Sequence, residues 1–311
     1  MLLKLQNKII VTFKNHFEYY IWGDFFMKLG LCLSGGGIKG FAHIGAIKAL
    51  EEANIKFYFI SGTSSGSIVS CLYASGFTVD EIYEIFRKNV NQIKYVDMKN
   101  VLKFLKNVIL KRDFNIDGLN SGEKIKKLVN EVCKTKGIEN INQIKMPLLI
   151  PAVNINTEKV YVFSNNILQN KCDEVKYINN VNIGTAVQAS CSYPGIFSPC
   201  KYKGELLVDG GISENLPWRE TKRAGADKVL SIVFTSKGKK CCKNLFEVIS
   251  KSFSILCHEL YKYEWEGTDY LLKIDTANVG LLEKSKMEEL YNQGYEQTKK
   301  KINEIKAKLN L

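Results

Sequence analysis

A serine between two glycines is the residue of this sequence best suited to act as a nucleophile. It lies in Gly62-Thr63-Ser64-Ser65-Gly66, after a short apolar stretch and before a run of small and apolar residues. G-x-S-x-G between a strand and a helix is typical of a nucleophile elbow, in which a tight turn exposes the serine hydroxyl. The pattern predicts that Ser64 attacks an acyl carbon.

A glycine-rich loop precedes this serine by one predicted helix and one predicted strand. The loop is Leu33-Ser34-Gly35-Gly36-Gly37-Ile38-Lys39-Gly40, and its free N–H groups, with the helix N-terminus after it, can bind an anion. The anion could be an oxyanion formed at Ser64, or a dinucleotide, because the loop also satisfies G-x-G-x-x-G. We favour the oxyanion, because the second strand ends in Ile60-Ser61-Gly62-Thr63 without the acid that would hold a ribose.

A nucleophilic serine needs a proton acceptor, and Asp209 is the first candidate. Leu206-Leu207-Val208 reads as a strand that ends in Asp209, Gly210 and Gly211. We expect this carboxylate at the carboxyl end of a strand, where ligands of open α/β sheets bind. If it is partly desolvated, its pKa rises toward neutral pH and it can take the serine proton directly. The alternative is that Asp209 only forms a turn before Gly210 and has no chemical role.

The chain has only three histidines, which restricts any mechanism that needs an imidazole. His16 lies outside the expected core, and His43 is interpreted as a packing or loop-supporting residue. His258 would complete the order Ser…Asp…His of α/β-hydrolases. It falls in a helical pattern rather than in a loop after a strand, so Asp209 is preferred.

These residues need a framework of alternating strands and helices. Such alternation predicts an α/β fold with a mainly parallel central sheet flanked by helices in three layers. Strands are expected at Lys28–Leu33, Phe57–Ile60, Leu148–Val153, Val160–Phe163, Leu206–Val208, Lys228–Phe234 and Tyr270–Ile274. Helices are expected at Gly40–Ala53, Ser67–Ala74, Ile183–Ala189, 243–262 and 286–308.

A mainly helical stretch is expected from about 79 to 135, with a break near Asp113–Gly118. Asn120 and Glu123 resemble a capping box before its last part. The stretch could cover the site with apolar side chains, but helices that simply pack on the sheet are the favoured interpretation. The apolar residues considered for the cover are Ile82, Ile85, Phe86, Val101, Phe104 and Leu105.

Four segments, in the order in which they occur along the chain, resemble the signatures of patatin-like phospholipases. Three of them are the glycine loop, the Ser64 elbow and Asp209-Gly210-Gly211, and the fourth is Ala189-Ser190-Cys191-Ser192-Tyr193-Pro194-Gly195-Ile196-Phe197-Ser198-Pro199. The likeness covers about Lys28 to Ile232. It implies a dyad of Ser64 and Asp209, an oxyanion hole from the loop backbone, and no metal or other cofactor. The implied oxyanion residues are Gly35, Gly36, Gly37 and Lys39, and the implied supporting glycines are Gly40, Gly62, Gly66, Gly210 and Gly211.

The resemblance implies a serine lipid acyl hydrolase that cleaves acyl esters through an acyl-enzyme, as phospholipases A and lysophospholipases do. Three alternatives remain open. The same dyad could transfer the acyl group to another acceptor, His258 could complete a Ser-Asp-His esterase, or the chain could be a dinucleotide- or lipid-binding module. The expected partner is a phospholipid or another acyl lipid.

Composition and charge set the remaining expectations. Lysine and arginine total 44 against 32 acids, a formal charge of +12, which allows peripheral contact with an anionic membrane. No nucleic-acid motif accompanies the charge, so nucleic acid is not an expected partner. Neither a signal peptide nor the roughly 18–20 apolar residues of a membrane span is found, and a cytoplasmic location is expected.

The chain is expected to divide into three parts. Residues 1–26 are either an extra helix or an upstream reading of the start codon. Residues 27–235 form the expected catalytic core, and residues 236–311 are expected to pack on the same domain.

Overall fold

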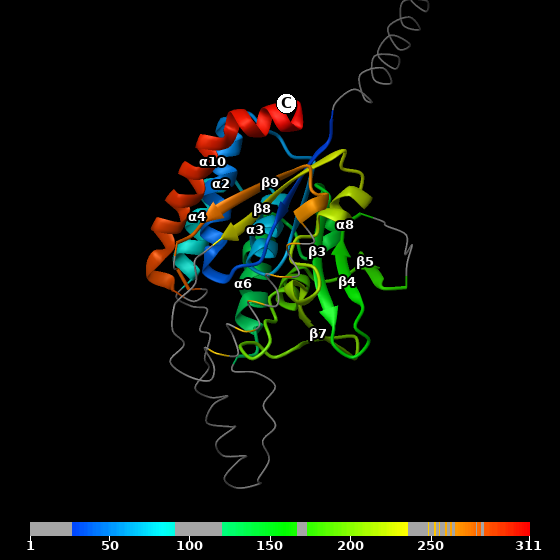
Figure 1. Ribbon diagram of the computed structural model, residues 1–311. Coiled ribbons are helices and arrows are strands. Elements are labelled where there is room, and N and C mark those ends of the chain that lie inside the picture. Colours follow the sequence, from blue (N-terminus) through cyan, green and yellow to red (C-terminus); the bar gives the residue numbers. More distant parts are fainter. Residues whose placement is uncertain are drawn as a thin grey trace, which may run out of the picture.

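The computed structural model describes residues 27–90, 120–166, 173–235, 265–277, 279–280 and 283–311, with a few single positions between 248 and 262. Its centre is one sheet whose main path runs β5-β4-β3-β2-β1-β8-β9 (Figure 1). The strands are β1 (Leu29–Leu33), β2 (Phe59–Gly62), β3 (Leu148–Asn154), β4 (Val160–Ser164), β5 (Val175–Ile178), β6 (Cys200–Tyr202), β7 (Glu205–Asp209), β8 (Lys228–Thr235) and β9 (Tyr270–Asp275). The helices are α2 (Gly40–Glu52), α3 (Ser65–Ala74), α4 (Val79–Asn89), α6 (Glu123–Lys134), α7 (Ile183–Ser190), α8 (Trp218–Arg223) and α10 (Met287–Leu309).

The sheet is parallel from β3 through β2, β1 and β8 to β9, as the alternation of strands and helices predicted. The departures lie on the other side of β3, which pairs antiparallel with β4 and with β7, while β6 and β7 form an antiparallel pair. The expected α/β class with a mainly parallel sheet is therefore confirmed. The antiparallel part also holds the segment that ends in Asp209.

Alternate residues of β1 face two different helix layers, which is why the strand is apolar throughout. Leu29, Leu31 and Leu33 belong to the larger core, which includes side chains of α2 and α10. Cys32 belongs to the smaller core on the other face, against which Trp218 at the start of α8 packs. The two helix layers therefore hold the carboxyl end of β1, where the glycine loop begins, from both sides.

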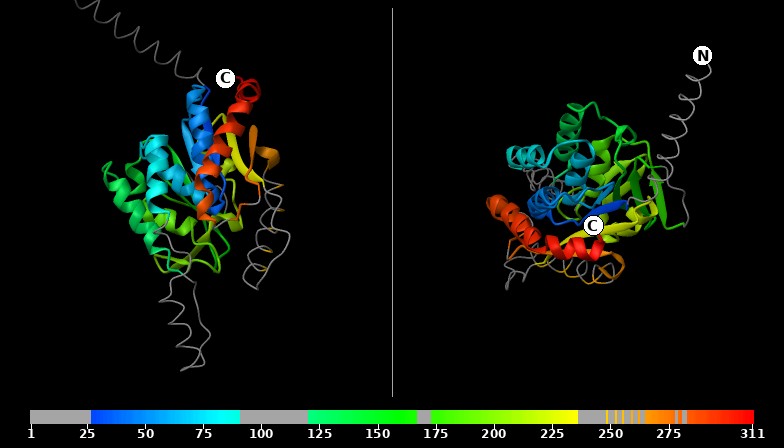
Figure 2. Two further views of the ribbon diagram at one scale, coloured as in Figure 1. Left: turned by 90° about the vertical axis from the view of Figure 1, so that its left-hand side faces the viewer. Right: turned by 90° about the horizontal axis from the view of Figure 1, so that it is seen from above.

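Helix α10 lies along α2, the helix that follows the glycine loop (Figure 2). The two backbones come so close that a Cβ added to Gly45 would lie 2.0 Å from the Tyr291 carbonyl oxygen. On the other helix, a Cβ on Gly294 would lie 2.0 Å from the Ala42 carbonyl oxygen. Glycine is needed at both positions for this close packing, which anchors the helix that begins at the loop.

Some local expectations were wrong. The capping box expected at Asn120 and Glu123 does not form, because Gly122 caps α6 with φ 71° and Asn120 Oδ1 accepts the Gly122 N–H instead. A capping box of this kind occurs at Thr78 and Glu81, where both reciprocal bonds are present at the start of α4. Strands β5 and β6 and helix α8 were not expected from the sequence, and the longest of the three has 6 residues.

Part of the helical stretch considered as a cover is described, and it packs on the core. Ile82 is buried, and the Phe86 ring packs edge to face on the Phe41 ring, with 5.5 Å between the ring centroids. Val101, Phe104, Leu105 and the expected break at Asp113–Gly118 lie outside the described residues, as do residues 1–26 and most of the helix expected at 243–262. Among the described helices, none has both the length and the hydropathy needed to cross a bilayer.

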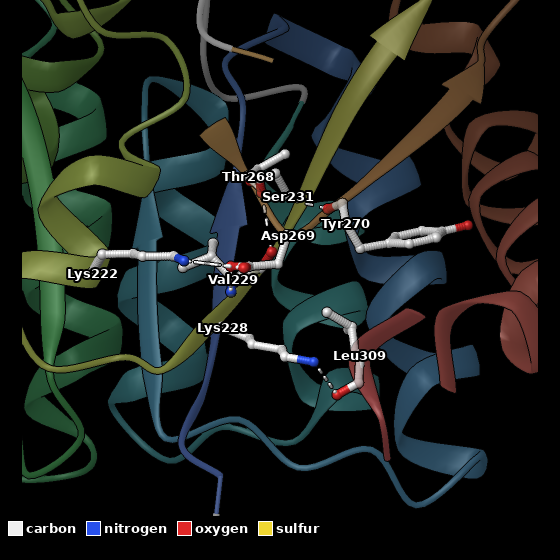
Figure 3. Close-up of polar contacts among 8 residues, drawn as sticks. All are labelled: Lys222, Lys228, Val229, Ser231, Thr268, Asp269, Tyr270 and Leu309. Atoms are coloured by element: carbon white, nitrogen blue, oxygen red, sulfur yellow. Dashed lines mark hydrogen bonds and ion pairs between the residues drawn. The ribbon is translucent and has the colours of Figure 1, made fainter. Parts of the chain in front are cut away.

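A polar cluster joins the amino ends of β8 and β9 (Figure 3). Because β1 is parallel to β8, this is the end of the sheet opposite to the glycine loop that follows β1. Asp269 accepts the Val229 N–H at 2.7 Å and forms an ion pair with Lys222 on α8 at 2.9 Å. The Thr268 hydroxyl bonds the Ser231 hydroxyl at 2.7 Å, and Lys228 Nζ donates to the Leu309 carbonyl at 3.0 Å. The cluster thus ties two strands to one helix on each face of the sheet.

Candidate active site

Ser64 has the backbone of a nucleophile elbow. It ends the connection after β2 and caps α3, with φ 53° and ψ −121°, a strained conformation for a residue with a side chain. A Cβ on Gly62 would lie 2.4 Å from the Gly66 carbonyl oxygen, and a Cβ on Gly66 would lie 2.5 Å from the Leu33 carbonyl oxygen. Only glycine fits at these two positions, so the predicted elbow is present. Helix α3 begins at Ser65, two residues earlier than expected.

The second candidate residue, Asp209, reaches the elbow through β3. Strand β2 pairs with β3 up to Leu149, and β7 pairs with β3 from Ala152 onward. Because β4 occupies the opposite edge of β3 at Ala152, β7 takes the edge that β2 has left. Strand β7 is thus the successor of β2 along one edge of β3, running in the opposite direction.

The pairing register explains why the two candidates meet. Ser61 pairs with Leu149, and Asp209 pairs with Ala152, three residues further along β3. Ser64 lies three residues beyond Ser61, so β7 ends where the elbow begins. Asp209 is the last residue of β7, so it lies at the carboxyl end of a strand as expected, but β7 runs antiparallel to β3. The register, not the rule for parallel sheets, brings the carboxylate to the serine.

The Asp209 carboxyl is buried but only partly satisfied. The residue is 2% exposed, and Oδ1 accepts the Gly211 N–H at 2.8 Å. Oδ2 is buried and lacks a hydrogen-bond partner of ordinary geometry. Burial raises the pKa of Asp209 from 3.8 to about 6, while hydrogen bonding from the Gly211 N–H and the Ser64 side chain opposes the rise. The carboxylate is therefore more basic than a solvent-exposed aspartate and still mostly ionised at neutral pH.

The glycine loop lies directly against the serine. A Cβ added to Gly35 would lie 3.1 Å from Ser64 Cβ, and one on Gly40 would lie 3.2 Å from Ser65 Cβ. The Gly35 N–H donates to Asn215 Oδ1 at 2.9 Å, and the Lys39 N–H donates to the Gly36 carbonyl at 3.2 Å. Two of the N–H groups assigned to the oxyanion hole therefore already have acceptors.

The N–H groups of Gly36 and Gly37 differ from these two. Neither donates a hydrogen bond to any residue in the described part of the chain. Gly37 has φ 58°, a conformation that favours glycine, and both residues are half-buried rather than enclosed. Within the described chain, these two N–H groups therefore have no acceptor of their own.

His43 supports the start of the glycine loop from α2. Its Nε2 lies 2.8 Å from the Ser34 carbonyl oxygen, and its ring centroid lies 4.3 Å from that of Phe234. Complete burial lowers the pKa of His43 to about 4, so the ring is neutral at pH 7 and donates to the carbonyl. His16 and His258 lie outside the described residues.

The structure adds residues that the sequence analysis did not single out. Ser190 Oγ accepts the Ser64 N–H at 3.0 Å. Cys191 Sγ lies 3.8 Å from Ser67 Oγ, and burial together with the charge of Asp209 raises the pKa of its thiol, which stays protonated. Ser190 and Cys191 are inside the fourth segment of the resemblance. Asn215, which holds Gly35, had no motif to mark it.

Known proteins similar to this chain include one from Bacillus subtilis (strain 168), "Uncharacterized protein YqhO", which is 30% identical over 72% of this chain and 78% of its own length. The "Lysophospholipase NTE1" of Yarrowia lipolytica is 28% identical over 66% of this chain, but that match spans only 12% of the larger protein. Among solved structures, VipD from Legionella pneumophila is similar with a TM-score of 0.49 and 17% identity, over 89% of this chain and 67% of VipD.

A family model described as "Patatin-like phospholipase" matches residues 31–222. That range contains the glycine loop, the Ser64 elbow and Asp209, and it confirms the resemblance that these segments carried. The enzyme class expected from the resemblance, a carboxylic ester hydrolase, is confirmed with it. The chain belongs to the patatin-like phospholipase family.

Proposed function

We propose that this protein hydrolyses acyl esters of phospholipids or lysophospholipids, with Ser64 as nucleophile and Asp209 as the only general base. The observation that supports this most is the meeting of the elbow with an incompletely satisfied, buried carboxyl at β3. A base of pKa about 6 accepts a serine proton more readily than an ordinary aspartate, yet is mostly ionised at neutral pH.

In the first half of the reaction, Asp209 Oδ2 takes the proton of Ser64 as its Oγ bonds to the acyl carbon. The carbonyl oxygen becomes an oxyanion beside the glycine loop, where backbone N–H groups stabilise it. As the tetrahedral intermediate collapses, the ester C–O bond breaks and the leaving alcohol takes the proton from Asp209. The acyl group is then esterified to Ser64.

In the second half, water replaces the alcohol. Asp209 removes a proton from the attacking water, the same loop stabilises the second oxyanion, and Ser64 recovers its proton as the fatty acid leaves. The neutral His43 is bonded to the Ser34 carbonyl and needs no part in this proton transfer. One carboxyl thus acts as base and acid in turn.

The substrate class rests on family membership and on similarity to a protein named as a lysophospholipase. Because the proposed substrate is a lipid, contact between the protein and a membrane surface is also proposed. The charge of +12 favours an anionic surface. No observation favours a dinucleotide, and the second strand provides no acid for one.

A labelling experiment tests the nucleophile. A fluorophosphonate should react with the wild-type protein and with Ser65→Ala, but not with Ser64→Ala. Ser65 is a matched control because it is adjacent, buried and part of the same motif. Ser64→Ala should lose turnover of a phospholipid and lysophospholipid panel by about 10⁴-fold or more. Activity or labelling that persists in Ser64→Ala would refute the proposal.

Two further measurements separate the alternatives. Product analysis with acyl-labelled phospholipid, with and without an added lipid alcohol, distinguishes fatty acid release from acyl transfer. His258→Ala should leave kcat within about threefold of wild type, because the dyad needs no imidazole. A loss of kcat in a folded His258→Ala protein would favour the Ser-Asp-His esterase.

A further inference from the structure

The segment after Asp209 holds three parts of the site together. Within a few residues of the carboxylate, the Glu214 backbone carbonyl accepts the Thr63 hydroxyl at 3.0 Å. The next side chain, that of Asn215, accepts the Gly35 N–H at 2.9 Å. One short stretch of chain thus connects the proposed base, the residue before the nucleophile and the start of the glycine loop.

Asn215 is itself held firmly. It is 5% exposed, and its neighbour Leu216 is buried in the smaller core. The Glu214 N–H donates to the Gly210 carbonyl at 2.7 Å, which fixes the turn that carries the asparagine. A Cβ at Gly35 would lie 2.7 Å from Asn215 Oδ1, so the amide lies against the loop backbone itself. A partner this constrained sets the position of the loop rather than following it.

We infer that Asn215 is a positioning residue, which takes the Gly35 N–H and thereby presents the Gly36 and Gly37 N–H groups to the oxyanion. The inference rests on the proposed function and changes its detail, because Gly35 then orients the oxyanion hole without donating to it. Gly35 is bonded to Asn215, whereas the next two N–H groups make no hydrogen bond within the described chain. Orientation of donors before reaction is what gives an oxyanion hole its effect.

The chain contains a matched control for a merely structural asparagine. Asn130 Oδ1 accepts the N–H of Gly184 at 2.9 Å, which is the same pair of groups at the same distance. That bond joins α6 to α7, and Asn130 makes no contact with Ser64 or Asp209 among the interactions of the described residues. Asn130→Ala therefore removes a bond of the same kind while the Asn215 bond to the glycine loop stays in place.

Steady-state kinetics with a lysophospholipid provide the first test. Asn215→Ala should lower kcat on the order of 10- to 100-fold with KM within about threefold, because only transition-state stabilisation is lost. Its inhibition constant for an alkyl trifluoromethyl ketone, which forms a tetrahedral oxyanion on serine, should rise by a similar factor. Asn130→Ala should leave both values unchanged even if its Tm falls. Asn215→Ala with wild-type kcat and inhibition constant would overturn the inference.

A second test needs no substitution, so it stands even if Asn215→Ala fails to fold. Selective ¹⁵N labelling of the 23 glycines allows amide exchange to be followed at the loop before and after fluorophosphonate modification of Ser64. The Gly35 N–H should be protected in both states, and Gly36 and Gly37 should become at least about tenfold slower only in the adduct. Slower exchange at Gly35 alone on modification would overturn the inference.

The outcomes distinguish this inference from the proposed function. Activity that persists in Ser64→Ala removes the proposed function, and the inference falls with it. Loss of activity in Ser64→Ala together with wild-type kinetics in Asn215→Ala leaves the dyad intact and removes only the role of Asn215.

Discussion

Two aspartates at opposite ends of the sheet differ in their burial and in the partners of their carboxylates. Asp269 lies where β9 begins, with its side chain 25% exposed, and its carboxylate is held by a backbone N–H and by Lys222 (Figure 3). Asp209 lies where β7 ends, 2% exposed, and its charge meets one backbone N–H, the Ser64 side chain and no cation in the described chain. The better-buried carboxylate thus has the poorer set of partners.

The contrast distinguishes a carboxylate that stabilises the structure from the carboxylate that is proposed as the base. Burial of a charge without full hydrogen bonding costs free energy of folding and raises the pKa of an acid. At Asp269 the partners offset this cost and join β8, β9 and α8. At Asp209 the cost is retained, and in the proposed mechanism Oδ2 of this carboxylate accepts the proton of Ser64.

Replacing Asp209 should abolish activity without loosening the fold. Asp209→Asn keeps an oxygen for the Gly211 N–H but cannot accept a proton, so kcat should fall on the order of 10⁴-fold. The Tm should stay the same or rise, because an incompletely satisfied buried charge has been removed. Asp269→Asn, measured in parallel by lipid turnover and thermal unfolding, should keep full activity. Equal losses of activity in both variants would remove the contrast.

Replacing Asp269 should have the opposite effect. Asp269→Ala leaves the Val229 N–H and Lys222 without their partner and should lower the free energy of unfolding by about 1–2 kcal/mol. The kcat should stay within about twofold, because the cluster lies far from the elbow. Urea unfolding of Asp269→Ala and Asp269→Asn provides the check, since the amide still offers an oxygen to Val229 and should restore part of the loss.

Activity and stability should respond to pH in opposite directions. The folded pKa of Asp209, about 6, is above its ordinary value of 3.8, so the native state binds the proton more tightly than the unfolded state. The stability that this group contributes is therefore complete below about pH 4 and lost as pH rises through about 6. Over the same window kcat/KM should rise, because the base becomes ionised.

The measurement is the difference in unfolding free energy between wild type and Asp209→Asn at several pH values. His43 also titrates in this range, with its pKa lowered to about 4, but it is present in both proteins and its contribution cancels. A kcat/KM profile with its midpoint near pH 4 would contradict an Asp209 that is desolvated in the free enzyme.

The smallest effect is expected at Lys222. Its ion pair with Asp269 is partly exposed on both sides, and such pairs contribute less than about 1 kcal/mol. Lys222→Met should therefore lower the free energy of unfolding by less than Asp269→Ala does, and by still less at high salt. Urea titrations at low and high salt test this. A larger loss in Lys222→Met would mean that the ion pair, rather than the Val229 bond, holds the cluster.

Several features of the site could be predicted from local sequence. The elbow and the glycine loop depend on backbone turns that only glycine allows, and Gly62, Gly66 and Gly37 mark those turns directly. The alternation of apolar runs and helical patterns likewise indicated a mainly parallel sheet. These are short-range effects, because the residues that cause the conformation lie within it.

Other local expectations failed where contacts outside the local segment determined the outcome. The capping box at Asn120 and Glu123 had the right residue types, but Asn120 folds back to the Gly122 N–H and its own N–H donates to the Ile196 carbonyl. His43 could have been a base from its type alone. Its complete burial and its bond to the Ser34 carbonyl make it a support of the loop.

Which side chains have the chemistry to react, and where the tight turns lie, could be seen in the local sequence, because side-chain chemistry and glycine conformations are local properties. The antiparallel direction of β7 and its place after β2 along β3, which bring Asp209 to Ser64, were established by the assembled sheet. The bond from the Gly35 N–H to Asn215, 180 residues away, likewise depends on the complete fold. Strand register and long-range hydrogen bonds depend on how the whole sheet is assembled, and no short segment carries that information.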